Sequence, residues 1–585
     1  MGLVFRLAAF FFAAALSAQV SFFPLRDVRA GMKGVGRTVF AGSRVEEFQV
    51  EVLGVLENAG PKQAVILMRL SGPAMDRAGV LQGMSGSPVF LDGRLAGAVA
   101  LAFPFSKEPI CGVRPIEEMV RVAERSPVKP ARAAITPWDR DLIRPAPDRA
   151  AAAFGESRLV EIATPVSFSG LTARTLEQFA PELRALGLEP RQGVTGGGAA
   201  DARMGDPKAL APGAMISAQL LSGDMIVAAD GTVTHIEGRR FYAFGHRFLG
   251  IGSTELPIAR AEVLTLLPSI ATSFKISTAR ETMGSITEDR STGVAGELGR
   301  RARTVPLEIS ITPRGSRAAA SRYRMQMVSD SVLSPLLVQM ATFSAIDATE
   351  RSVGSSSFIL RGQIRFRAPT PPARVDNMFS GDVSVGLQAS LGVASPLAFA
   401  LQSGFDSLRL SGVTLEIESI PEKKQMQIDQ VWTRRREVRP GERVELVVSL
   451  SGDNGSEQVR RVSYLVPAGA SAGPLYFTVA DAMTTNLTEY RQLLTAPPRS
   501  AEQVLSILNG LRGNTKGYVR VWRPDAGFQV QGEDLPSAPP SLAMILSRVA
   551  GAPSGRGSKL AELEFSAPDA VVSGAKTIQV EVKDR

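Results

Sequence analysis

The chain has 585 residues, of which 44% are hydrophobic and 21% charged, and this composition excludes an intrinsically disordered chain. The length is too great for one hydrophobic core, so roughly three or four domains are expected. The net charge of +9 is spread thinly, and its densest cluster, residues 434–436, is predicted to be a solvated strand face, so no nucleic-acid partner is expected. With 55 Gly, 38 Pro and 6% aromatic residues, the chain is expected to be mainly β, with many short strands and turns.

Residues 1–18 have the features of a secretory signal peptide. Arg6 supplies the positive charge, residues 7–16 form a short apolar core, and a cleavage site follows Ala18. The apolar run is shorter than the roughly 20 residues that a membrane span needs, and no later stretch is judged long enough. The sequence therefore predicts an exported protein of the periplasm, the cell envelope or the medium, without an integral span after cleavage. An uncleaved N-terminal anchor is the alternative.

Residues 19–125 are predicted to form a strand-rich unit that ends in a short helix at residues 115–123. Phe48, Val50 and Val52 alternate with polar residues, as in a half-buried strand. Cys111 is the only cysteine, so no internal disulfide can form, and its apolar neighbours favour a buried thiol at a strand end.

The most informative stretch of this unit is residues 83–88, Gly-Met-Ser-Gly-Ser-Pro. Apolar residues at 78–81 and 89–91 predict a strand on each side, and an Asp-Gly turn at 92–93 leads to a further strand at 95–101. Small neighbours allow a sharp bend at Ser85, so that its hydroxyl projects and successive N–H groups converge. Such an arrangement suits acyl transfer, in which negative charge develops on the attacked carbonyl oxygen.

The rest of the chain is divided by changes in composition and by turn signals. We expect a Pro/Ala/Arg-rich linker at 126–157, a helical and Gly-rich connection at 158–211, a second strand-rich unit at 212–300, a β-rich extension at 301–368, a β-sandwich-like domain at 369–490 and a C-terminal α/β segment at 491–585. Residues 369–372 (Pro-Thr-Pro-Pro) are predicted to be a linker. Residues 500–511 predict an amphipathic helix capped by Ser500.

The chain contains two histidines, so a serine nucleophile has two candidate bases. His235 lies near a predicted hairpin turn and is interpreted as an exposed strand residue. His246 follows Gly245 where a loop leaves an aromatic strand, and the glycine lets the imidazole turn into a cleft. A lone histidine satisfied by packing and a backbone carbonyl is the alternative for His246.

Residues 80–88 and the segment from Gly231 to His246 resemble the SpoIVB family of serine peptidases. The resemblance implies a chymotrypsin-like double β-barrel, with one half at 19–125 and the other at 212–300, followed by β-sandwich-like domains. It implies Ser85 as nucleophile, His246 as general base, and an oxyanion hole from the N–H groups of Gly83, Met84 and Ser85. In the family the histidine segment comes first, so the reversed order here indicates a permuted arrangement.

The family's acidic residue lies about fifteen positions before the serine, in a strand-to-loop transition. Residues 69–73 of this chain contain no carboxylate. Asp76, the nearest acid before Ser85, is one candidate for the third member of the site. Asp289, from the second unit, is the other, and the sequence leaves the choice open.

These features predict an exported serine endopeptidase that acts on protein or peptide substrates. The alternative is a catalytically silent, double-barrel binding or scaffold protein of the cell envelope, and a weaker one is a structural protein in which residues 83–88 form only a turn. No cofactor is expected, and a metal site would need more Cys and His than this chain has. The oligomeric state is left open.

Overall fold

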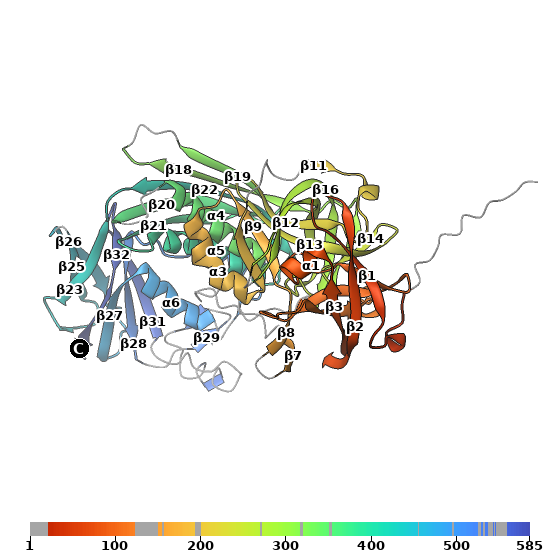
Figure 1. The fold of residues 1–585 in the computed structure, drawn as a ribbon. Helices are drawn as coiled ribbons and strands as arrows, with labels where there is room; N and C mark the ends of the chain where they lie inside the picture. Colours follow the sequence, from red (N-terminus) through yellow and green to blue (C-terminus); the bar gives the residue numbers. More distant parts are fainter. Residues whose placement is uncertain are drawn as a thin grey trace, which may run out of the picture.

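The structure is a computed structural model in which strands predominate, which confirms the predicted mainly β class (Figure 1). It describes residues 22–122, 150–154, 157–193, 201–269, 272–315, 320–349, 354–453, 455–493, 497–524, 528–530, 533–535, 542, 544–545 and 558–584. The predicted signal peptide and most of the predicted 126–157 linker lie outside these residues.

The N-terminal strands form a closed barrel around the first core. Its six strands pair in the order β4-β1-β2-β3-β6-β5, and β5 pairs again with β4. Their bounds are Lys33–Val39 (β1), Val45–Gly60 (β2), Gln63–Ser71 (β3), Pro88–Leu91 (β4), Arg94–Ala102 (β5) and Ile110–Pro115 (β6). Phe48, Val50 and Val52 are buried in this core as predicted. Strands β7 (Ala150–Phe154) and β8 (Ser157–Glu161) extend the sheet beyond β5.

A second set of six strands also forms a closed cycle of hydrogen-bonded neighbours. The order is β13-β14-β17-β16-β15-β12, and β12 pairs back with β13. Their bounds are Met215–Gly223 (β12), Ile226–Glu237 (β13), Arg240–Ala243 (β14), Gly252–Leu267 (β15), Phe274–Arg290 (β16) and Gly293–Leu298 (β17). Three short strands extend this set: β9 (Thr164–Ser169) pairs with β13, β10 (Leu188–Gln192) pairs with β9, and β11 (Asp201–Met204) pairs with β16. Helix α3 (Ala173–Ala185) packs on β10. This second set lies beside the first barrel (Figure 1).

The same sheet continues through β19, β18, β22, β20 and β21. Their bounds are Thr304–Pro313 (β18), Ser321–Val328 (β19), Ser356–Phe366 (β20), Ala373–Gly381 (β21) and Leu410–Ile420 (β22). Residues 369–372, predicted to be a linker, instead lie in the connection of the β20–β21 hairpin, so they do not separate domains.

Two apolar helices, which the sequence analysis did not single out, pack against each other beside this sheet. They are α4 (Leu333–Thr349) and α5 (Val385–Gln402). By length and composition, α5 is the one helix among the described residues that is able to cross a membrane. In this structure it also contacts β20 and β21, and 56% of its most apolar window is buried.

The C-terminal residues form two facing sheets around one core, with strand orders β26-β25-β23-β32 and β24-β33-β27-β28-β31. Their bounds are Gln425–Thr433 (β23), Glu437–Val438 (β24), Arg443–Gly452 (β25), Glu457–Leu465 (β26), Gly473–Asp481 (β27), Lys516–Arg523 (β28), Ser558–Ser566 (β31), Val571–Ser573 (β32) and Ala575–Val582 (β33). A small hairpin is formed by β29 (Phe528–Val530) and β30 (Glu533–Leu535). The sandwich therefore draws on both of the last two predicted segments. Residues 434–436 are exposed, as expected, but lie in the connection between β23 and β24.

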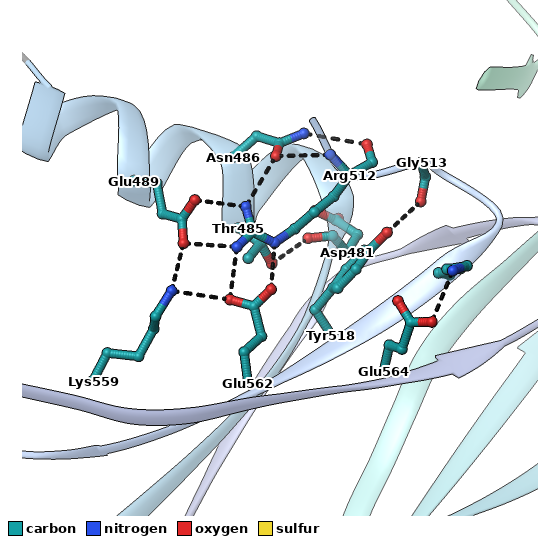
Figure 2. Close-up of polar contacts among 11 residues, drawn as sticks. Asp481, Thr485, Asn486, Glu489, Arg512, Gly513, Tyr518, Lys559, Glu562 and Glu564 are labelled. Carbon is teal, nitrogen blue, oxygen red and sulfur yellow. Dashed lines mark hydrogen bonds and ion pairs between the residues drawn. The ribbon is translucent and has the colours of Figure 1, made fainter. Parts of the chain in front are cut away.

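Helices α6 (Ala482–Leu493) and α7 (Ala501–Asn509) lie between β27 and β28 in the chain. Ser500 caps α7 as predicted, because its Oγ accepts the N–H of Gln503. Arg512 follows α7 and binds the carboxylates of Glu489 on α6 and Glu562 on β31 (Figure 2). Lys559 also binds Glu489, so this cluster fastens α6 to the sandwich.

Candidate functional site

Residues 79–87 connect a short helix, α1 (Pro73–Ala78), to β4. The strand predicted at residues 78–81 is therefore wrong, because Ala78 ends a helix and the residues after it form a loop. Pro73 opens that helix, and Gly79 ends it with a φ of +66°. The strand after Pro88, the turn at 92–93 and the following strand are confirmed as β4 and β5.

The serine loop, defined here as residues 82–87, bends twice at glycine. Gly83 and Gly86 have φ values of +90° and +95°. The N–H of Met84 donates to the Leu81 carbonyl at 3.1 Å, and this bond occupies one of the three predicted oxyanion-hole donors. Within the described part of the chain, the N–H groups of Gly83 and Ser85 have no hydrogen-bond acceptor. The Ser85 hydroxyl is buried and likewise has no hydrogen-bond partner among those residues.

Strand β13 of the second unit fastens the serine loop by three successive contacts. The N–H of Thr232 donates to the Ser85 carbonyl at 2.9 Å, and its Oγ1 donates to the Gly83 carbonyl at 2.8 Å. Two residues further along the same face of the strand, Thr234 Oγ1 donates to the Gly86 carbonyl at 2.7 Å. Neither threonine was predicted to have a role, and their period-two spacing is the only feature of the sequence that indicates a shared face.

The corner that carries His246 is anchored on the same residues. Phe244 donates its N–H to the Thr232 carbonyl at 3.2 Å. The Val99 carbonyl of β5 accepts the Gly86 N–H at 2.7 Å, and a Cβ atom at Gly245 would lie 3.2 Å from that same oxygen. Gly86 therefore binds the Val99 carbonyl, and Gly245 has no room for a side chain beside the same carbonyl. The structure brings the two predicted segments together across the boundary of the two units, but Ser85 Oγ makes no hydrogen bond to the His246 ring.

His246 is fully buried, and its orientation is fixed by a neighbouring carbonyl. Its Nδ1 lies 2.7 Å from the Arg247 carbonyl oxygen. A carbonyl only accepts hydrogen bonds, so Nδ1 carries the proton and, in the neutral ring, Nε2 carries the lone pair. The side chain of Arg247 is held in turn by an ion pair with Glu161 at 3.1 Å.

The two candidate acids occupy different places. Asp289 lies on β16 and is fully buried, and its carboxylate accepts the N–H groups of four successive residues, 248–251, at 2.7–3.3 Å. Burial raises its pKa, while these four hydrogen bonds oppose that rise. Asp289 therefore shapes the loop that follows His246. Asp76 is exposed on α1, where Oδ1 accepts the Gly72 N–H of its own helix at 3.3 Å.

His235, predicted to be an exposed strand residue, is instead buried, with 5% of its surface exposed. Its ring meets Phe22 edge-on and stacks on Tyr242, which explains the burial. Burial lowers its pKa. Cys111 is buried near the start of β6 as predicted, and burial raises its pKa to about 12. The raised pKa keeps the Cys111 thiol protonated at neutral pH, so this residue is not a nucleophile.

A pocket of about 570 Å³ lies near the serine loop, although no residue of the loop lines it. Phe90, Leu95 and Ile236 give it an apolar wall, and Thr234, which binds the Gly86 carbonyl, also lines it. Its rim carries the ion pair between Arg37 and Glu47. Among the described residues, no group of three His, Cys, Asp or Glu side chains is arranged to hold a metal ion.

Comparison with known proteins gives one finding. Residues 16–120 match the model of the SpoIVB peptidase S55 family, which confirms the resemblance for the serine-bearing unit. This match spans the serine loop but not His246 or Asp289. No significant match to a curated protein or to a solved structure was found.

Proposed function

We propose that this protein is an exported serine endopeptidase of the SpoIVB type in which Ser85 and His246 perform the chemistry. One observation carries the proposal. The serine loop and the His246 corner are joined through the backbone of Thr232, and they pack so closely at Gly86 that no side chain fits there, although one lies in the first barrel and the other in the second set of strands. Convergence of two distant segments on one point is how a double-barrel peptidase builds its site.

In the proposed mechanism, Ser85 Oγ attacks the carbonyl carbon of a peptide bond while its proton passes to His246 Nε2. The oxyanion that forms is stabilised by the N–H groups of Gly83 and Ser85, which have no acceptor among the described residues. The imidazolium then gives its proton to the leaving amine, and an acyl-enzyme ester remains. Water, deprotonated by His246, hydrolyses this ester and restores the Ser85 hydroxyl.

The Arg247 carbonyl performs one function of the acidic residue in the family, which is to orient the histidine ring. By accepting the Nδ1 proton it selects the tautomer whose Nε2 can remove the serine proton. A neutral carbonyl stabilises the imidazolium less than a carboxylate does, so turnover slower than that of a Ser-His-Asp enzyme is expected. Asp289 supports the same region by holding residues 248–251.

Substrate access requires the site to open, because Ser85 and His246 are both fully buried. The pocket lined by Thr234, with Phe90, Leu95 and Ile236 on its wall, suits an apolar side chain of the substrate. In this proposal the two closed sets of strands act as a chymotrypsin-like double barrel joined in reversed order. The leader at residues 1–18 directs the protein out of the cytoplasm.

A catalytically silent envelope scaffold is the second candidate, and the burial of both side chains favours it. The two candidates differ in proteolysis. An unfolded protein such as reduced casein should be cleaved by the wild-type chain and by Ser471→Ala, which alters an exposed serine of the sandwich, but not by Ser85→Ala. If the folded wild type and Ser85→Ala leave casein equally intact, the scaffold is supported and the peptidase is not.

A further inference from the structure

A buried lysine lies against the serine loop and takes no part in the chemistry proposed above. Lys275, on β16, is 2% exposed, and its Nζ donates to Thr38 Oγ1 on β1 at 2.7 Å. Thr38 Oγ1 also accepts the hydroxyl of Ser87 at 3.1 Å. Thr38 and Ser87 are completely buried, so this chain of three polar groups is shielded from water.

Lys275 reaches both ends of the serine loop. Its backbone N–H donates to the Gln82 carbonyl at 3.2 Å, at the start of the loop. Its stem follows the loop, since a Cβ atom at Gly83 would lie 3.4 Å from Lys275 Cδ. Its ammonium group acts through Thr38 on Ser87 at the end of the loop. Ser85 lies between these two points, the first held by the backbone of Lys275 and the second by its side chain.

Asp230 is the charged group that acts on this lysine. It is buried on β13, where Ser277 and Ser217 hydrogen-bond its carboxylate. Burial lowers the pKa of Lys275 to about 7, and Asp230 opposes that change. Burial likewise raises the pKa of Asp230 to about 6, opposed by its serine partners and by Lys275. An apolar residue would fill the same space without this desolvation cost, so packing alone does not account for a lysine here.

We propose that Lys275 is a positioning residue for Ser85, which holds the serine loop at both ends through Gln82 and through the Thr38–Ser87 hydroxyl pair. The role of the loop in catalysis rests on the proposed function, but its restraint by Lys275 does not. The lysine comes from the second unit and the loop from the first. The conformation of the serine loop therefore depends on how the second set of strands packs against the first barrel.

The matched pair of variants changes Thr38, which links the lysine to the serine loop. Thr38→Val keeps the shape but removes the hydroxyl, whereas Thr38→Ser keeps the hydroxyl. The double variant Lys275→Met/Asp230→Asn removes both buried charges together, so that neither is left alone. Each variant is compared with the wild type in thermal unfolding, in amide hydrogen exchange of residues 82–88, and in the second-order rate of labelling by a fluorophosphonate.

Thr38→Val and the double variant are expected to exchange these amides about tenfold faster and to label at least about tenfold more slowly. Thr38→Ser should match the wild type in both measurements. The proposal is overturned if folded Thr38→Val keeps the wild-type exchange and labelling rates, or if Thr38→Ser is equally impaired. If the fluorophosphonate does not label the wild type, the proposed function fails. The role of Lys275 is then decided by the hydrogen exchange of residues 82–88 alone. If the double variant does not fold, the threonine pair decides.

Discussion

Thr232 donates its backbone N–H to the carbonyl oxygen of Ser85 at 2.9 Å, and its own carbonyl accepts the N–H of Phe244, two residues before His246. A single residue of β13 thus joins the candidate nucleophile to the corner that carries the candidate base. This link depends on spatial contact and not on chain order, which explains how the serine segment can precede the histidine segment and still meet it.

Gly86→Ala tests how closely the two units approach each other at the site. A Cβ atom at Gly86 would lie 2.0 Å from the Thr232 carbonyl oxygen and 2.5 Å from the Phe244 nitrogen, on a residue with a φ of +95°. We expect a loss of about 3 kcal/mol or more in the free energy of unfolding, from backbone strain and the clash together. Gly93→Ala is the control, because φ is +73° there but nothing lies within 4 Å, and it should cost about 1 kcal/mol. Equal losses in urea unfolding would contradict this close contact.

His246→Ala tests the general base. Removing Nε2 should lower the rate of proteolysis by about 10²–10⁴-fold, as expected for the loss of a general base, while the protein stays folded. The other histidine provides the control, since His235→Phe preserves the aromatic contacts with Phe22 and Tyr242 and, at the wall of the pocket, should lower the rate far less than His246→Ala does. The assignment fails if His235→Phe, and not His246→Ala, abolishes cleavage in the folded protein.

Asp289→Asn tests which acid supports the site. The amide nitrogen would face backbone N–H donors that now share two carboxylate oxygens, so unfolding should become easier by about 2–3 kcal/mol. The rate of proteolysis should fall with it, because residues 248–251 follow His246. Asp76→Asn alters an exposed carboxylate and should change the free energy of unfolding by less than about 0.5 kcal/mol, with an unchanged rate. A strong loss of activity in Asp76→Asn alone would make Asp76 the third member of the site.

Glu489 makes the C-terminal sandwich sensitive to acid. Burial raises the pKa of this carboxyl, but the hydrogen bonds from Arg512 and Lys559 outweigh that effect and hold it at about 2 (Figure 2). Its unfolded pKa is 4.5, so the stabilisation is complete above that pH and is lost as the pH falls from 4.5 towards 2. When the free energy of unfolding is measured with denaturant, Glu489→Gln should lose less of it than the wild type over this pH range. Glu564 forms an exposed ion pair with Lys516, so Glu564→Gln should leave the pH dependence of the free energy of unfolding unchanged.

The sequence was informative wherever local chemistry is distinctive. The bend around Ser85 was identified from its glycines, and the cap of α7 from Ser500 and the apolar spacing after it. The contacts that join the site were not predictable, because Thr232 and Gly83 are 149 residues apart and a threonine in a strand has no feature that indicates its partner.

Helices α4 and α5 were missed for a different reason. Both are apolar on nearly every side, because they pack on each other and on the sheet, so they lack the polar face that marks a surface helix. Helix α5 also contains Pro396 in its interior, which argues against a helix in the sequence alone. Residues 78–81 were misassigned because four small or apolar residues fit a strand and a helix end equally well.

The most direct test of the central claim is to locate a fluorophosphonate adduct by mass spectrometry. If Ser85 is the nucleophile, each folded chain gains one adduct, on the peptide that contains Ser85. This adduct is absent in Ser85→Ala and forms much more slowly in His246→Ala. A folded wild-type protein that gains no adduct, or that carries it on a serine other than Ser85, would contradict the account.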